Sequence, residues 1–241
     1  MTKRLVRLPK KGRAVLVGDT HGDYQASRLV IKNYLRRNTC VVFLGDYVDR
    51  GPDSRENIDY LLKLREKHEN LVLLLGNHEG FPVVECSPCD FWDELNTSPE
   101  TTSFYAEVFS KLPLVAIGNG FLAVHGGLPD VSRLKQIEEI QPGDEQWVRI
   151  TWGDFKDKPG DYLGEFCGRP RFGKDYFERI MKSFHLNVLV RSHDPVAPER
   201  MYDDRCLTIF TSSAYGRDRK IALVNLERRV RSADDFEIIA F

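Results

Sequence analysis

Short, continuous apolar runs alternate with helix-like segments along the first third of the chain. Three of these runs each end in a Gly-Asp or Gly-Asn turn, at residues 14–19, 41–46 and 71–77. Helix-like segments follow the first two, at residues 24–37 and 54–68. Runs of Leu and β-branched residues bounded by glycine predict strands that are buried on both faces. Their alternation with helices predicts βαβ units in a parallel or mixed sheet.

Beyond residue 110 the predicted strands follow one another more closely. Residues 114–117 and 121–124 flank Gly118-Asn119-Gly120, which predicts a hairpin turn. The other predicted elements are a helix at residues 174–185 and strands at residues 188–191, 206–210, 220–224 and 236–239. Residues 85–100 and 154–170 are predicted to be excursions over the surface, and Ser54 is a candidate cap for the second helix. No linker or repeat divides the chain, so we expect one α/β domain over residues 1–241.

The composition indicates a globular protein without an excess of basic residues. Of the 241 residues, 41% are hydrophobic and 29% are charged, and 35 Lys plus Arg balance 36 Asp plus Glu. A nucleic-acid-binding protein usually has a basic excess, so we expect no nucleic-acid partner. No apolar stretch is long enough to span a membrane, and the basic N-terminus lacks the apolar core of a signal peptide. Five cysteines without such a signal predict free thiols in a cytoplasmic protein.

Polar residues follow the carboxyl ends of five predicted strands. They are Asp19 and His21, Asp46 and Asp49, Asn77 and His78, His125, and His193. Ligands of open α/β sheets bind beyond the carboxyl ends of the strands, so we expect these side chains to converge. Carboxylate, amide oxygen and imidazole donors without a thiolate favour manganese, with iron or zinc as alternatives, over a structural zinc site of the cysteine type. The sequence therefore predicts a centre for two divalent metal ions.

Five short motifs contain these residues: GDTHG (18–22), GDYVDRG (45–51), GNHE (76–79), HGG (125–127) and RSH (191–193). In this order they resemble the PPP family of phosphoprotein phosphatases over residues 13–216, and look most like its compact bacterial, archaeal and phage members. The resemblance implies a calcineurin-like metallophosphoesterase fold, a four-layer α-β-β-α sandwich with mixed sheets. It also implies a serine/threonine protein phosphatase that attacks phosphate monoesters with a metal-bridging hydroxide. The expected substrates are phosphoproteins or small phosphoesters, with phosphotyrosine as an additional candidate.

The resemblance assigns a role to each site residue. It places Asp19 and His21 at the first metal and Asn77, His125 and His193 at the second. It places Asp46 as a bridge between both ions. It makes His78 the general acid, oriented by Asp49, and gives phosphate binding to Arg50 and a second arginine. The stretch CGRPRFG leaves both Arg169 and Arg171 as candidates for that second arginine, and we favour Arg169.

A positioned acid suits this chemistry because a serine alkoxide is a poor leaving group. Planar guanidinium groups suit phosphate because they form paired hydrogen bonds. The turn TWGD, with Trp152 and Asp154, resembles a turn that lines the groove in relatives, and Tyr215 resembles a tyrosine beside their active site. Glu79 is expected to orient neighbouring ligands.

Further residues near these motifs have plainer interpretations. Phe91 and Trp92 are expected to pack beneath their loop, with a substrate-facing rim as the alternative. Cys86 and Cys89 have the spacing of zinc and redox sites, but there is no second pair of this kind, so we expect free thiols.

Two other functions are compatible with parts of the pattern. A symmetrical dinucleoside polyphosphate hydrolase has a similar metal site, but such proteins resemble GDLVARG and GNHD where this chain has GDYVDRG and GNHE. Asp49 and Glu79 therefore favour the monoester phosphatase. A catalytically silent binding protein is expected to have lost a ligand or the acid, and every such position is filled here. The oligomeric state is not predicted by the sequence.

Overall fold

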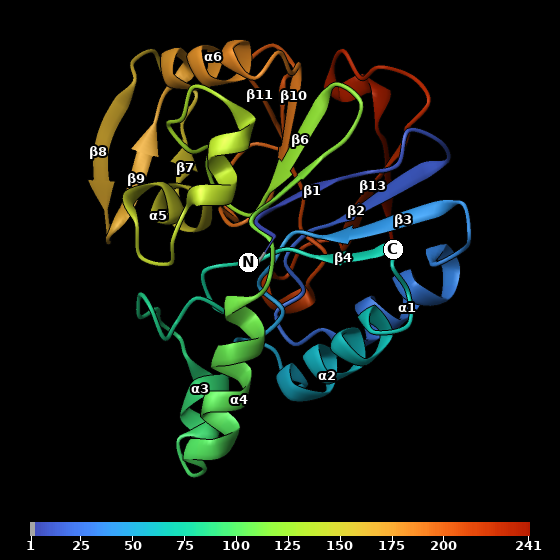
Figure 1. Ribbon diagram of the computed structural model, residues 1–241, viewed down its shortest axis with the longest axis vertical. Coiled ribbons are helices and arrows are strands. Elements are labelled where there is room, and N and C mark those ends of the chain that lie inside the picture. The colour runs from blue at the N-terminus through green and yellow to red at the C-terminus, as the bar shows by residue number, and fades with distance from the viewer. Residues whose placement is uncertain (1–2) are drawn as a thin grey trace.

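Two β-sheets pack face to face at the centre of the computed structural model, which describes residues 3–241 (Figure 1). The five-stranded sheet has the order β14 (Glu237–Ala240), β13 (Lys220–Asn225), β2 (Arg13–Val17), β3 (Thr39–Phe43), β4 (Leu71–Leu73). The six-stranded sheet has the order β1 (Leu5–Arg7), β5 (Val115–Ile117), β6 (Phe121–Val124), β10 (Val188–Arg191), β12 (Cys206–Thr208), β11 (Arg200–Met201). Both sheets are mixed, since β2, β3 and β4 run parallel while β13 is antiparallel to β2, and β6, β10 and β12 run parallel while β5 is antiparallel to β6.

Successive residues of each strand face opposite layers, which is why the apolar runs are continuous. Leu16 and Val42 of one sheet pack with Ala123 and Val190 of the other in an apolar layer between the sheets. The alternate residues face outward under helices. Those of the five-stranded sheet pack under α1 (Tyr24–Tyr34) and α2 (Ser54–Arg65), and those of the six-stranded sheet under α6 (Lys174–Ser183). The expected α-β-β-α sandwich is confirmed.

Several predicted boundaries agree with the structure and others are wrong. The hairpin at Gly118-Asn119-Gly120 is present, with the Gly118 amide donating to the carbonyl oxygen of Phe121 at 3.0 Å. The prediction that Ser54 caps α2 is wrong. Asp53 is the N-cap residue, and the Ser54 hydroxyl accepts a hydrogen bond from the Asp49 amide at 2.9 Å. Ser54 thus holds the turn that presents Asp49, instead of closing the helix.

The two predicted surface excursions contain regular structure. Residues 85–100 include α3 (Asp90–Leu95) and the start of α4 (Pro99–Ser110), which project from the lower part of Figure 1. Residues 154–170 contribute to a third, small sheet of β7 (Asp154–Phe155), β9 (Arg169–Phe172) and β8 (Tyr162–Phe166). Helix α5 (Glu145–Trp152) precedes this sheet, and three 3-10 turns lie at Leu134–Glu139, Ser213–Tyr215 and Ala233–Asp235.

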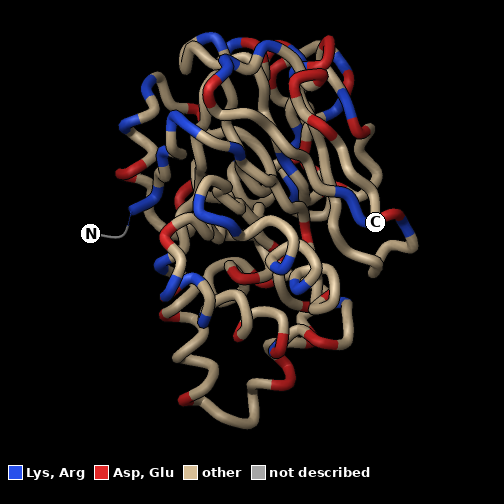
Figure 2. The backbone as a smooth tube through the Cα atoms, turned by 90° about the vertical axis from the view of Figure 1, so that its right-hand side faces the viewer, with Lys and Arg blue, Asp and Glu red and all other residues tan. Residues whose placement is uncertain are grey.

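Basic and acidic residues are interspersed along much of the backbone tube in Figure 2. This agrees with the formal net charge of −1. Within residues 3–241, no helix combines the length and the apolar character that crossing a membrane requires.

Candidate metal centre

The predicted ligands converge at one edge of the two sheets. Asp19, Asp46 and Asn77 follow β2, β3 and β4 of the five-stranded sheet, whereas His125 and His193 follow β6 and β10 of the six-stranded sheet. All of them are buried. The carboxylate of Asp46 lies at the centre: its Oδ2 is 3.6 Å from His21 Nε2 and 3.3 Å from His125 Nε2. Two clusters of donor atoms share this carboxylate, one with His21 and His78 and the other with His125 and His193.

Backbone carbonyl groups fix the orientation of three histidines. Nδ1–H of His21 donates to the carbonyl of Val48 at 2.9 Å, and Nδ1–H of His125 donates to that of Leu44 at 3.0 Å. His193 uses its other nitrogen, Nε2–H, which donates to the Trp152 carbonyl at 3.2 Å. A carbonyl can only accept, so these nitrogens must carry the hydrogen. The remaining nitrogen of each ring points toward Asp46 and its neighbours, as in histidines that bind metals.

The centre of the site gathers electron-rich atoms with too few hydrogens between them. His125 Nε2 lies 3.0 Å from both Asn77 Oδ1 and His193 Nδ1. Asp19 Oδ2 is buried, has no hydrogen-bond partner among the described residues, and lies 3.7 Å from His21 Nε2. Unpaired acceptors in a buried place are costly unless a cation joins them. The donor set therefore fits divalent metal ions.

The electrostatics separate the histidines into two kinds. Burial lowers the pKa of His21 to about 3, and burial together with Arg169 holds the pKa of His193 well below its usual value. Both rings are therefore neutral near pH 7 and can donate a lone pair. Burial acts in the same direction on His125 and His78, but it is outweighed by Asp46 together with Asp19 at His125, and by Asp46 together with Asp49 and Cys86 at His78, so the pKa of both rings is raised.

Asp19 and Glu79 show how strongly this site disfavours further negative charge. Burial, and then the nearby Asp46 carboxylate, raises the pKa of Asp19 to about 6 and that of Glu79 to about 8. Glu79 is indeed buried, and its carboxylate accepts hydrogen bonds from the amides of Asp46, Tyr47 and Gly76 at 2.8–3.1 Å. These hydrogen bonds hold the backbone beneath Asp46, and within residues 3–241 none joins the Glu79 carboxylate to the side chain of a predicted ligand.

His78 and Asp49 form a buried pair beside this cluster. His78 Nδ1 is 2.5 Å from Asp49 Oδ2, and Asp49 Oδ1 accepts a hydrogen bond from the Phe91 amide at 2.8 Å. The other nitrogen of His78, Nε2, lies 3.5 Å from Arg50 Nη2 and faces a cavity. Phe91 and Trp92 are buried, as predicted, and Trp92 Nε1 donates to the His78 carbonyl at 2.9 Å.

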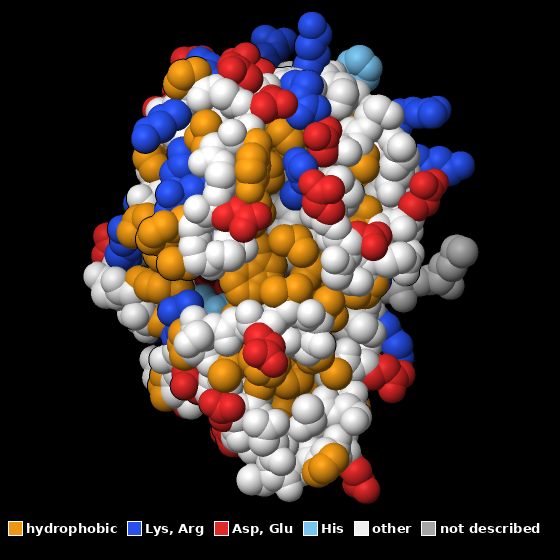
Figure 3. Space-filling model, turned by 90° about the vertical axis from the view of Figure 1, so that its left-hand side faces the viewer, with side chains coloured by type: hydrophobic (Ala, Val, Ile, Leu, Met, Phe, Trp, Pro, Cys, Tyr) orange, Lys and Arg blue, Asp and Glu red, His pale blue; other side chains and the backbone are white. Residues whose placement is uncertain are grey.

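The cavity above the cluster has a volume of about 660 Å³ and mixes cationic with apolar walls. Its lining includes Arg50, Arg169, Trp152, Cys86 and Tyr215. Figure 3 shows a hollow with a histidine on its floor, next to a basic side chain and to apolar side chains. This lining suits an anionic group attached to a partly apolar substrate.

The two candidate arginines differ in position. Arg169 lines the cavity, and its Nη2 donates to Asp154 Oδ1 at 2.8 Å. Arg171 is absent from the lining and stacks on Phe166, with its guanidinium carbon 4.2 Å from the ring centroid. Tyr215 lies where the resemblance placed it, its hydroxyl 3.1 Å from His21 Nε2.

Sequence reasoning missed two features of the site. Arg191 is fully buried and donates to the carbonyl of Gly126 at 2.8 Å and to Asp154 at 3.3 Å, so Asp154 holds two arginines in place. An arginine in an otherwise apolar strand was the available signal. The second feature is Cys86, whose Sγ lies 3.5 Å from His78 Nδ1. As expected, Cys86 and Cys89 are both free thiols.

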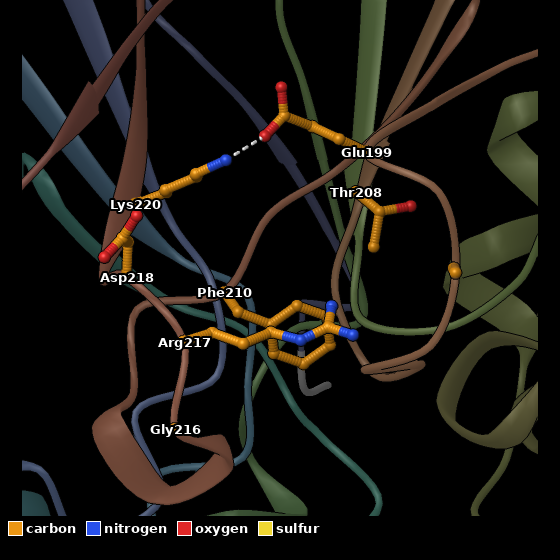
Figure 4. Close-up of a pocket in the computed structure, with 8 residues that line it drawn as sticks. Glu199, Thr208, Phe210, Gly216, Arg217, Asp218 and Lys220 are labelled. Atoms are coloured by element: carbon orange, nitrogen blue, oxygen red, sulfur yellow. Dashed lines mark hydrogen bonds and ion pairs between the residues drawn. The ribbon is translucent and has the colours of Figure 1, made fainter.

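Another cavity, of about 400 Å³, is lined in part by Phe210, whose ring contacts that of Tyr215 (Figure 4). It is lined by Phe210, Arg217, Asp218 and the ion pair of Lys220 with Glu199. Its charges balance and it contains no histidine or cysteine, so it does not offer a comparable donor set.

Comparisons with known proteins agree with this geometry. Residues 12–197 match the sequence profile described as calcineurin-like phosphoesterase. A probable serine/threonine-protein phosphatase from Encephalitozoon cuniculi is 30% identical over 232 residues, which is 88% of this chain and 50% of that protein. The chain thus spans about half the length of the first curated relatives it matches.

Solved structures with the same fold include two of particular interest. A serine/threonine phosphatase from Saccharomyces cerevisiae with similarity to human PP5 superposes with a TM-score of 0.79 at 23% identity, covering 100% of this chain and 83% of that one. A putative diadenosine tetraphosphatase superposes with a TM-score of 0.59 at 18% identity, covering 99% and 97%. At these identities the likeness concerns the fold alone.

Proposed function

The chain belongs to the calcineurin-like phosphoesterase family, and from this premise we propose that it is a two-metal phosphatase of phosphoserine and phosphothreonine monoesters. The observation that supports the proposal best is the orientation of His21, His125 and His193. Each ring donates one hydrogen to a backbone carbonyl and turns its other nitrogen toward the shared carboxylate of Asp46. Curated relatives named as serine/threonine phosphatases support the substrate class.

We assign the six donors to two ions. The proposed ligands are Asp19 and His21 at one ion, Asn77, His125 and His193 at the other, and Asp46 between them. Oxygen and imidazole donors suit manganese, with iron or zinc as alternatives. When bound, such a pair of ions supplies a hydroxide at neutral pH and neutralises charge on the phosphate.

The remaining side chains complete the proposed reaction. His78 lies against Asp46 and Asp49, which keep its ring protonated, so it can give a proton from Nε2 to the leaving alkoxide. Asp49 holds the ring in place through Nδ1. Arg50 and Arg169 both line the cavity and would bind phosphate oxygens through paired hydrogen bonds.

A side-by-side assay tests this proposal. The metal-depleted chain is supplied with Mn²⁺ and given phosphoserine and phosphothreonine peptides, a phosphotyrosine peptide and diadenosine tetraphosphate. We expect Mn²⁺-dependent release of phosphate from the first two peptides, and its loss in Asp46→Asn. Faster turnover of the dinucleotide than of either peptide would establish the dinucleoside polyphosphate hydrolase instead. Phosphate release that survives metal depletion would contradict both.

A further inference from the structure

A thiol lies within the cavity beside the proposed acid. Cys86 lies on the loop that leads into α3, and its side chain is partly buried. Its Sγ is 3.5 Å from His78 Nδ1, which is itself 2.5 Å from Asp49 Oδ2. These three donor atoms all lie within 4.8 Å of one another. The cluster shares His78 with one of the two clusters that contain Asp46, but Cys86 and Asp49 belong to neither of those two.

The spacing of these atoms is close to that of a tetrahedral zinc site. Zinc binds thiolate at about 2.3 Å, imidazole at about 2.0–2.1 Å and carboxylate at about 2.0–2.2 Å. At tetrahedral angles these bonds separate sulfur from nitrogen by roughly 3.6 Å, and nitrogen from oxygen by roughly 3.3 Å. The Cys86–His78 separation of 3.5 Å already fits. Asp49 Oδ2 would have to move away from His78 Nδ1 by roughly 0.8 Å, while its Oδ1 keeps the Phe91 amide.

We propose that Cys86, His78 and Asp49 bind a single thiophilic cation, zinc or cadmium, separately from the two ions of the main centre. The donor chemistry distinguishes this site from the main metal centre. The main centre offers only oxygen and imidazole donors, whereas the sulfur of Cys86 selects soft cations over manganese. The cation reaches the site through the cavity that Cys86 and His78 both line, and water fills its fourth position.

Occupation of this site would inhibit the enzyme, a consequence that rests on the proposed function. The cation takes the nitrogen through which Asp49 orients His78. It also places a positive charge on the ring that has to carry and release a proton. A soft cation would therefore switch off the acid while the main centre stays loaded with manganese.

Cadmium binding tests the site without reference to catalysis. Cd²⁺ is added to the full chain in excess Mn²⁺, and the ultraviolet charge-transfer absorption of the cadmium–thiolate bond is titrated. We expect a band that saturates at one Cd²⁺ per chain, that is lost in both Cys86→Ser and Cys86→Ala, and that persists in Cys89→Ser. Cys89 is the matched control because its thiol points to Asp93, at 3.5 Å, and lies outside the cluster. An equal band in the Cys86 variants, or no band in the native chain, would overturn the site.

A second experiment tests whether a cation at this site inhibits the enzyme. Zn²⁺ is titrated in excess Mn²⁺ with a small aryl phosphate as substrate, and the rate of each variant is normalised to its own uninhibited rate. The Zn²⁺ concentration for half-inhibition should rise at least tenfold in Cys86→Ser and stay unchanged in Cys89→Ser. Equal sensitivity of all three proteins would place the inhibition at the main centre. A chain that binds Cd²⁺ through Cys86 but hydrolyses no phosphoester would retain the site and disprove the proposed function. A chain that hydrolyses phosphoesters but does not bind Cd²⁺ through Cys86 would disprove the site and leave the proposed function standing.

Discussion

Several residues of the candidate site adopt backbone conformations that side chains other than glycine seldom take. The φ angles of His21, Asp46, Asp49, Arg50 and His193 are 42°, 54°, 68°, 70° and 70°. Each such residue costs on the order of 1 kcal/mol or more and persists only when its surroundings enforce it. This strain lies in the turns that follow the strands and carry the site side chains. No sequence pattern reveals it, because the motifs specify which residues stand there but not their φ angles.

Replacement of His78 by Asn tests the proposed acid. We expect kcat to fall by at least about 10², because the leaving alkoxide loses its proton donor, while manganese remains bound. The measurement is turnover of a phosphoserine peptide, with manganese content determined on the same sample. The matched control is His185→Asn, since His185 is exposed and has a φ of 56°, which Asn tolerates. Full activity in His78→Asn, or loss of metal from it, would contradict the assignment.

Asp154 is expected to be important for stability as well as for phosphate binding. It accepts hydrogen bonds from Arg169 in the cavity and from the fully buried Arg191. In Asp154→Asn the buried guanidinium loses its counter-charge, so we expect the free energy of unfolding to fall by about 3 kcal/mol. Arg169 also loses its fixed position, so KM for a phosphopeptide should rise. Urea denaturation and steady-state kinetics measure the two effects.

A nearby exposed carboxylate provides the control for that change. Asp157→Asn should alter the free energy of unfolding by less than about 0.5 kcal/mol. If both substitutions had the same small effect, Asp154 would have no special role.

At the scale of elements, the sequence predicted the strands and helices that have a strong hydrophobic pattern. It missed the elements that are held in place by tertiary packing. The central strands were located well because they are apolar on both faces, and their ends gave the site residues. Helices α3 and α4 lie partly within a segment rich in Pro, Ser and Cys. They are held by an aromatic cluster that brings Phe91 and Trp92 of α3 against Tyr105 and Phe109 of α4, contacts that local sequence does not show.

The small third sheet was missed for a related reason. Strand β8 is mostly exposed or half-buried, and Gly164 lies within it while Gly168 follows it, so it shows neither strict alternation nor a continuous apolar run. Its register with β9 is also irregular between Tyr162 and Glu165. Pairing with β9 defines this strand, and pairing is not visible in local sequence. The position of Arg169 on β9 could not be predicted for the same reason, and the alternative of Arg171 remained open.

The start of α1 offers a prediction about stability and pH. Asp23 accepts the Ala26 amide as the N-cap of α1, and it also binds the Ser213 amide and the Arg219 guanidinium. It thereby ties the helix to the loop that carries Tyr215. We expect Asp23→Ala to reduce the free energy of unfolding by about 1–2 kcal/mol, as a lost cap and a partly exposed ion pair imply.

The pH dependence of that effect follows from the pKa of Asp23. Burial acts to raise this pKa, but Arg219 and the backbone amides outweigh it, and the pKa is lowered. A lowered pKa contributes stability that is present above the unfolded value of about 3.9 and is lost as the pH falls through the folded value. The difference between native chain and variant should therefore be constant near neutral pH and shrink below about pH 4. Asp53→Ala is the control, because Asp53 is the N-cap of α2 without a side-chain cap bond. A difference independent of pH would show that the carboxylate charge is irrelevant.

At the scale of the whole molecule, the proposed metal centre joins the two sheets. Asp19, Asp46 and Asn77 come from the five-stranded sheet, and His125 and His193 come from the six-stranded sheet. The unfolded chain cannot bring these residues together, so ions bound here stabilise the folded state by mass action. At 100 times the dissociation constant the gain is about 2.7 kcal/mol, which for a chain of this length corresponds to a rise in Tm of roughly 5–10 °C.

This stabilisation can be separated from catalysis. We expect Mn²⁺ to raise the Tm of the metal-depleted chain by that amount and a chelator to reverse the change, as measured by circular dichroism. Because Asp46 lies in both donor clusters, Asp46→Asn should lose most of the shift. His78→Asn should retain it, because His78 is not one of the six proposed ligands. Equal shifts in both variants would mean that manganese binds elsewhere. If manganese did not change the Tm of the native chain, the proposal that bound ions join the two sheets would be contradicted. The assignment of these six side chains to one centre would then lose its basis.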